Sequence, residues 1–207
     1  WGLIDTVGRF SGYEGCTALP VDGAYVLLQA DRKKTRRHIH NGERPFLMAM
    51  IVSIGSGKGG VGKSVIAANL SMLLAKQGKR VVLADLDVGG ADAHILFGML
   101  NPPRTLTDFV ERRVERLDDV LQQVSAHPFL QLIPGTGDTL ATANLPYAKK
   151  KRLIRHFRQL QADVIIVDIG AGTSYHALDF FLMADHYLTV ATPDPTSVLD
   201  LYRFIKL

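Results

Sequence analysis

The stretch from residue 48 to residue 78 constrains the fold of this chain more than any other part of the sequence. An apolar run of strand length, residues 48–54, leads into a glycine-rich loop whose sequence is Gly57-Lys58-Gly59-Gly60-Val61-Gly62-Lys63-Ser64. Residues 64–75 then have helical spacing, and Gly78 follows at the position where glycine favours the end of a helix. Strand, glycine loop and helix in this order predict the first unit of an α/β sheet.

The loop itself fits the phosphate-binding pattern G-x-x-x-x-G-K-[S/T]. Its glycines allow a tight turn that points successive backbone N–H groups at phosphate oxygens, and the helix that follows adds partial positive charge at its N-terminus. We expect Lys63 to reach the β- and γ-phosphates and Ser64 to bind Mg²⁺. All eight loop residues, Gly57 to Ser64, are therefore predicted to bind a nucleotide.

Three carboxylates follow two further apolar runs. Residues 80–84 end in Asp85-Leu86-Asp87, and residues 163–167 end in Asp168. Because ligands bind at the carboxyl ends of parallel strands, these acids are expected at the same edge of the sheet as the loop. Strand alternation puts Asp85 and Asp87 on one side. An acid that closes an apolar strand, such as Asp168, is the arrangement that holds Mg²⁺, usually through water.

Five strands are predicted along the chain, at residues 48–54, 80–85, 129–133, 163–168 and 187–191. They alternate with helical stretches, which indicates an α/β fold with a doubly wound, mostly parallel sheet covered on both faces. Short helices are predicted at residues 106–110 and 118–121. A helical pattern occupies residues 197–207, and no strand follows it.

The segment Lys58-Gly59-Gly60-Val61-Gly62-Lys63-Ser64 resembles the deviant Walker A motif of the MinD/ParA ATPases. The resemblance implies a P-loop NTPase of the SIMIBI type that uses ATP and Mg²⁺ and dimerises when ATP is bound. It also implies that Lys58 contacts the nucleotide phosphates of the other subunit, that Asp85 supports the magnesium and its waters, and that Asp87 orients the attacking water. Lys58, Lys63 and Asp87 are thus the candidate catalytic residues, and Ser64, Asp85 and Asp168 the candidate magnesium residues, the carboxylates acting through water.

The resemblance covers about residues 48–207. The turn after Asp168 lacks the proline of most MinD and ParA patterns, and both this turn and the segment Thr192-Pro193-Asp194-Pro195-Thr196-Ser197 look more like the FlhG/FleN regulators of flagellar number. Family members carry further strands, so residues 47–207 are predicted to be a P-loop ATPase domain that is incomplete at its C-terminal side. Residues 1–46 have weak periodicity and are predicted to be an extension or a tag-like segment, with a small native domain as the alternative.

The chain has no apolar run near the roughly 20 residues that cross a bilayer. Its only cysteine is Cys16. Both features favour a cytoplasmic protein, with a peripheral location at the inner membrane as the alternative. Residues 31–37 contain five Lys or Arg, and residues 149–158 contain six. The second segment has amphipathic helical spacing, and it is interpreted either as a solvated helix face or as a surface for DNA or an anionic membrane.

The leading functional hypothesis is an ATP-binding and ATP-hydrolysing switch. It forms an ATP-dependent homodimer, hydrolyses slowly without a protein activator, and controls the position or number of a flagellum, division site or chromosome. An iron–sulfur carrier ATPase of the Mrp/NBP type is the alternative. It needs cysteines, and none lies between Thr17 and Leu207, so no iron–sulfur cluster is expected in this chain. The third hypothesis, an ATP-sensing adaptor without turnover, is disfavoured by the complete set of acids and lysines.

Overall fold

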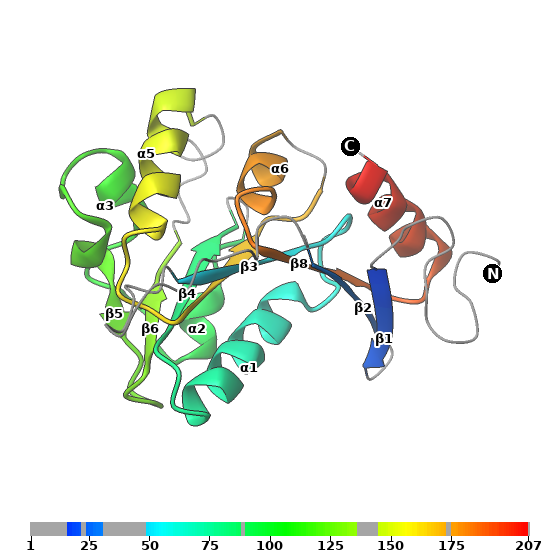
Figure 1. Cartoon of the computed structure of the whole chain (residues 1–207), viewed down its shortest axis with the longest axis horizontal. Coiled ribbons are helices and arrows are strands. Elements are labelled where there is room, and N and C mark those ends of the chain that lie inside the picture. The colour runs from blue at the N-terminus through cyan, green and yellow to red at the C-terminus, as the bar shows by residue number, and fades with distance from the viewer. Residues whose placement is uncertain are drawn as a thin grey trace, which may run out of the picture.

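A single mixed sheet organises the chain (Figure 1). The computed structural model describes residues 16–21, 24–30, 49–87, 90–135, 145–172 and 175–206. In this part of the chain eight strands are hydrogen-bonded in the order β1-β2-β8-β3-β7-β4-β6-β5. The five central strands are parallel to one another, and the outer pairings on both sides are antiparallel.

The five parallel strands are the ones that the sequence predicts. They are β3 (Met50–Gly55), β4 (Val81–Leu86), β6 (Leu130–Ile133), β7 (Val164–Ile169) and β8 (His186–Ala191). Each begins and ends within two residues of the predicted bounds. The prediction of a mostly parallel sheet is confirmed, and it succeeds because strands buried on both faces appear in the sequence as short continuous apolar runs.

Helices cover both faces of this sheet (Figure 1). On one face lie α1 (Lys63–Lys76) and α2 (Ala93–Leu96); on the other lie α3 (Leu106–Val110), α5 (Tyr147–Phe157) and α6 (Tyr175–Phe181). The 3₁₀ helix η1 (Leu117–Val120) leads into the short strand β5 (Gln122–Gln123). Helix α7 (Pro195–Lys206) follows β8 and contacts α6 through Phe204 and Phe181, whose ring centroids are 4.9 Å apart.

The alternation of side chains in β4 divides the core into two layers. Val81 and Leu83 pack with α1, whereas Val82 and Ala84 pack with α3 and α5. Asp85 continues the first set, so the chain's own pleat directs this acid to the α1 side of the sheet.

Helix α1 ends as the sequence predicts. Gly78 has a φ of +80°, in the left-handed region that favours glycine. Its N–H donates to Ala75 O and the N–H of Lys79 donates to Leu74 O, which together form the Schellman arrangement that terminates a helix.

Two strands of the sheet come from residues 1–46, where the sequence analysis predicts no element. They are β1 (Cys16–Val21) and β2 (Ala24–Ala30), which pair antiparallel, and β2 pairs antiparallel with β8. The sequence did carry a signal for this hairpin, because Asp22-Gly23 is a preferred two-residue hairpin connection. Pro20, a residue that weakens a strand prediction, obscured it.

None of the helices in the described part of the chain combines the length and the hydrophobicity needed to cross a bilayer.

Candidate functional site: the phosphate loop and its carboxylates

The sheet order brings the three predicted motifs to one edge. Strands β3, β7 and β4 are parallel neighbours in this order, so their carboxyl ends lie side by side. The glycine loop leaves the end of β3, Asp168 lies near the end of β7, and Asp85 near the end of β4. Asp85 and Asp168 are direct partners in the β4–β7 register. Segments that are far apart in the sequence therefore form one polar site.

Lys63 lies at the centre of this site. It is the first residue of α1, and its side chain is only 8% exposed. Its Nζ lies 3.2 Å from Asp87 Oδ2 and 3.5 Å from Asp168 Oδ1. A lysine this buried needs paired negative charge. The two carboxylates hold its ammonium group where the loop and the ends of the strands converge.

Asp168 is a buried carboxylate of the kind that can bind a cation. It is almost completely buried, with Lys63 Nζ 3.5 Å from its Oδ1 and the Ser64 hydroxyl close by. Among the described residues, no hydrogen bond of standard geometry reaches either carboxylate oxygen. Burial raises the pKa of Asp168, while Lys63 and Ser64 act in the opposite direction. Two such neighbours leave part of the acceptor capacity of this buried carboxylate unused, and a divalent cation or its water would fill it.

The described residues contain no group of three or more His, Cys, Asp or Glu side chains arranged around a metal position. A protein-only cage is therefore not the arrangement seen in this part of the chain. The residues do fit Mg²⁺ in the mode that keeps water and substrate phosphates as ligands, with Ser64 and Asp168 as the protein groups.

Asp85 is used differently. Its two carboxylate oxygens accept hydrogen bonds from the backbone N–H groups of Asp87 and Ala93, each at 3.0 Å. These bonds fix the start of the loop that carries Asp87 and the beginning of α2. Burial, followed by the nearby Asp168, raises the pKa of Asp85 to about 7, against the lowering effect of the two backbone donors.

This raised pKa predicts a pH dependence of stability for the nucleotide-free protein. The folded state holds the Asp85 proton between pH ~4, the unfolded pKa, and pH ~7, so the contribution of this group to stability is complete below pH ~4 and falls as the pH rises to ~7. Asp85→Asn removes the titration. We expect the free energy of unfolding of the variant, relative to wild type, to increase by roughly 1–3 kcal/mol between pH 5 and pH 8.

Urea denaturation at several pH values measures this difference. Asp92→Asn, an exposed position before α2, is the control for the loss of one carboxylate. A difference between Asp85→Asn and wild type that stays constant from pH 5 to pH 8 would contradict the assignment.

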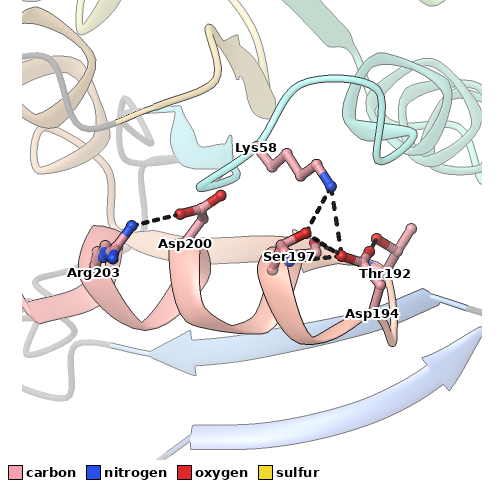
Figure 2. A network of polar contacts seen from close by, with 7 residues as sticks. Lys58, Thr192, Asp194, Ser197, Asp200 and Arg203 are labelled. Atoms are coloured by element: carbon pink, nitrogen blue, oxygen red, sulfur yellow. Dashed lines mark hydrogen bonds and ion pairs between the residues drawn. The ribbon is translucent and has the colours of Figure 1, made fainter.

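Lys58 does not point into this cluster. Its side chain is 44% exposed and reaches the beginning of α7, as Figure 2 shows. There its Nζ donates to Thr196 Oγ1 at 2.9 Å and lies 3.5 Å from Asp194 Oδ1. The resemblance implies that Lys58 contacts the nucleotide phosphates of the other subunit, which a single chain does not test. Within the chain, its amino group lies against a helix cap.

Asp194 is that cap. Its Oδ1 accepts the N–H of Ser197, and its other carboxylate oxygen accepts the hydroxyl of Thr192 (Figure 2). The hydroxyls of Thr192 and Thr196 and this N–H hold the pKa of Asp194 well below its usual range. Asp followed by Pro195 at the first helical position is a standard helix start, so the cap was visible in the sequence. Its contact with Lys58 was not, because 136 residues separate the two.

Helix α7 also contacts the glycine loop through backbone. A Cβ added to Gly57 would lie 2.2 Å from the carbonyl carbon and oxygen of Asp200 and 2.5 Å from Leu201 N. On the other side of the loop, the N–H of Gly172 donates to Ser56 O at 3.0 Å. The loop is therefore fixed between α7 and the segment that follows β7.

Gly57→Ala tests this close approach. We expect it to lower the free energy of unfolding by at least about 2 kcal/mol, because the methyl group would overlap the α7 backbone, which cannot move away as a side chain can. Gly59→Ala is the matched control, since nothing lies within 4 Å of a Cβ at that position and its φ is not positive. Equal melting temperatures for the two variants would show that the helix is not packed on the loop.

Comparison with known proteins gives the same family from three directions. Residues 48–207 match the family model described as "ParA: NUBPL iron-transfer P-loop NTPase". The chain is 35% identical over 159 residues to the antiactivator FleN of Pseudomonas aeruginosa, with 76% of this chain and 55% of FleN covered. It is 33% identical over 162 residues to the flagellum site-determining protein YlxH of Helicobacter pylori, with 75% of this chain and 52% of YlxH covered.

Among solved structures, the septum site-determining protein MinD of Pyrococcus horikoshii in complex with Mg-ADP superposes with a TM-score of 0.66. It is 26% identical, and the match covers 77% of this chain and 64% of that protein. The chain thus spans little more than half the length of the two relatives described above. The matched region contains the glycine loop, the three carboxylates and helix α7.

Proposed function

The chain belongs to the ParA family of P-loop NTPases, and on this premise we propose that it is an ATP-driven switch that dimerises around bound nucleotide. One observation carries the proposal. The amino group of Lys63 is buried between Asp87 and Asp168, and Asp168 is itself a buried carboxylate that has Lys63 and Ser64 beside it. This arrangement is suited to receive a phosphate at the lysine and a cation at the acid.

Each residue of the site has a distinct role in the proposed reaction. Lys63 leaves its carboxylate partners to bind the β- and γ-phosphates, while the loop backbone from Gly57 to Gly62 encloses them. Ser64 and Asp168 would hold Mg²⁺, which would neutralise phosphate charge. Asp87 accepts a hydrogen bond from the attacking water and orients it. Asp85 supports the magnesium waters indirectly, because its own oxygens position the Asp87 backbone.

Lys58 is proposed to act on the nucleotide of the other subunit. Its half-exposed side chain is held by the hydroxyl of Thr196 and by Asp194, contacts that a solvated lysine can exchange at little cost. In a nucleotide-bridged dimer, its charge stabilises the phosphates across the interface. Hydrolysis is then slow in the isolated subunit, because the site is complete only on assembly.

The proposed cellular role is control of the position or number of a structure such as a flagellum, a division site or a chromosome. The support is that YlxH is a flagellum site-determining protein and that the Pyrococcus horikoshii MinD is a septum site-determining protein. A cytoplasmic protein that acts at the inner membrane, with a protein activator, fits this role.

An iron-carrying function is the second candidate, because the matching family model takes its description from an iron-transfer NTPase. The matched residues 48–207 contain no cysteine, since Cys16 is the only one in the sequence. Thiolate ligands for a cluster would therefore have to come from outside the matched region, and the switch is the function that the residues present support better.

Solution mass tests the switch. Light scattering of Asp87→Ala, which should bind nucleotide without hydrolysing it, is expected to give a dimer in Mg-ATP and a monomer in Mg-ADP. Asp92→Ala, exposed and close in sequence, controls for loss of charge, and a fluorescent ADP analogue confirms that both variants bind nucleotide. One unchanging mass in both nucleotides would overturn the proposal and favour a constitutive oligomer or a carrier.

A further inference from the structure

The basic segment at residues 149–158 separates into two kinds of cation in the folded chain. Three of its six Lys and Arg side chains have structural partners. Lys150 pairs with Asp179, Arg158 makes two hydrogen bonds to Asp185 and one to Met183 O, and Arg152 donates to Phe109 O and Glu115 O at 2.8 Å. These cations connect α5 to α6, to the residues just before β8 and to the α3–η1 loop.

The guanidinium of Arg152 also stacks on a ring, with its Cζ 4.0 Å from the centroid of Phe109. This contact and its carbonyl acceptors, Phe109 O, Val114 O and Glu115 O, connect α5 to the α3–η1 loop. Arg152 is therefore held in place by the fold.

The side chains of the other three cations, Lys149, Lys151 and Arg155, make no hydrogen bond or ion pair with any residue that the structure describes. With Arg112 of the α3–η1 loop, whose side chain also has no such partner among the described residues, they line a groove of about 780 Å³ along α5. Ala148 and Ile154 lie in the same lining, so apolar surface is interspersed among the cations. A volume of this size is typical of ligand pockets.

Arg112 has a backbone conformation that is unusual for its residue type. Its φ is +61°, and among the described residues it is the one non-glycine residue with a positive φ. It follows the C-cap of α3, where glycine is the favoured residue. Backbone sterics disfavour an arginine at such a position. We therefore expect the Arg112 side chain to have a function that a glycine could not supply.

We propose that this groove, formed by Arg112, Lys149, Lys151 and Arg155, binds an acidic segment of a protein partner that also carries an apolar side chain. The cations match carboxylates, with arginine able to bind them in bidentate fashion, and Ala148 and Ile154 provide apolar contact between them. The site lies on α5 and the α3–η1 loop, and none of its residues belongs to the nucleotide site.

The shape of the surface favours a protein segment over duplex DNA or a membrane, the two ligands suggested by the charge of the sequence. A duplex and a bilayer present their phosphates on convex or flat surfaces, which are best met by protruding cations. Here half of the basic segment is neutralised within the fold, and the free cations surround a hollow. Positive charge on this side of α5 is also felt by His156, because burial and then the neighbouring Arg152 and Arg155 lower its pKa.

Selection from a random peptide library tests the proposal on the full chain. The wild-type protein is compared with Arg112→Gly/Arg155→Ser, and with Lys76→Ser/Lys79→Ser, which removes two exposed charges at the end of α1. We expect wild type and the lysine control to select peptides rich in Asp and Glu with at least one large apolar residue. The affinity of these peptides, measured by fluorescence anisotropy, should fall at least tenfold in the arginine variant.

The same variants are also tested against a 20-base-pair duplex and against phosphatidylglycerol vesicles. In the double variant, Arg112→Gly relieves the unfavourable backbone conformation, so the melting temperature of the double variant should equal or exceed that of wild type. Loss of binding is thereby separated from loss of folding. Duplex or vesicle binding that depends on Arg112 and Arg155 would overturn the proposal. So would a selected pool that is not enriched in acids, or peptide affinity that is equal in all three proteins.

Discussion

Mixing two inactive variants should restore ATP hydrolysis. Lys58→Ala lacks the lysine proposed to act across the dimer, and Asp87→Ala lacks the residue proposed to orient water. A mixed dimer contains one complete site, in which Asp87 of the first variant meets Lys58 of the second. Random pairing of equal amounts into two-fold dimers gives roughly a quarter of the wild-type number of complete sites, and hence about a quarter of the wild-type rate.

Each variant alone is expected to lose about 10³-fold or more in rate. Lys58→Ala loses the charge supplied in trans, which contributes on the order of 10³–10⁵ in related phosphoryl transfers, and Asp87→Ala loses the group that orients the attacking water. Phosphate release over a titration of one variant with the other measures the recovery. Lys79→Ala mixed with Asp87→Ala is the control for the general effect of mixing. If Lys58 acts within its own subunit, no mixture regains activity, and that result would remove the trans role.

Lys58→Ala should fold normally. The amino group is half exposed, and its contacts with Thr196 and Asp194 lie at the surface, where such contacts contribute little to stability. An unchanged melting temperature together with a lost rate would therefore assign the effect to catalysis.

Lys63→Ala should abolish both nucleotide binding and hydrolysis, and it should also change the nucleotide-free protein. Its removal leaves Asp87 and Asp168 without the cation that now lies 3.2 Å and 3.5 Å away. Because Asp168 is buried, its carboxylate would take up a proton rather than remain charged. We expect the rate to fall at least about 10³-fold and the pH dependence of stability to increase.

Fluorescent nucleotide titration and denaturation at pH 6 and pH 8 measure the two effects of Lys63→Ala. Lys76→Ala, an exposed lysine at the other end of α1, should change neither. Lys63→Arg retains the charge and should recover stability more than activity, since the guanidinium does not reproduce the point contact of an ammonium group. Retained nucleotide affinity in Lys63→Ala would contradict the site as described.

Much of the fold could be predicted because its signals are local. The five parallel strands are continuous apolar runs, and the end of α1 is marked by Gly78. Even the convergence of the loop, Asp85 and Asp168 followed from one rule, that parallel strands present their carboxyl ends at the same edge. The hairpin β1–β2 has a local signal in Asp22-Gly23, but its place beside β8 depends on a pairing over a long sequence distance, which no local pattern encodes.

The sequence by itself determined the α/β fold, the phosphate loop and the identity of the acids around it. Only the tertiary structure decided how the charges are paired: Lys63 with Asp87 and Asp168, Lys58 with the cap of α7, and three of the six cations on α5 with acids and carbonyls of other elements. The physical reason is that residue type fixes what a side chain can bind. Which partner lies within reach, and whether water competes for it, is fixed by contacts between elements that are distant in the chain.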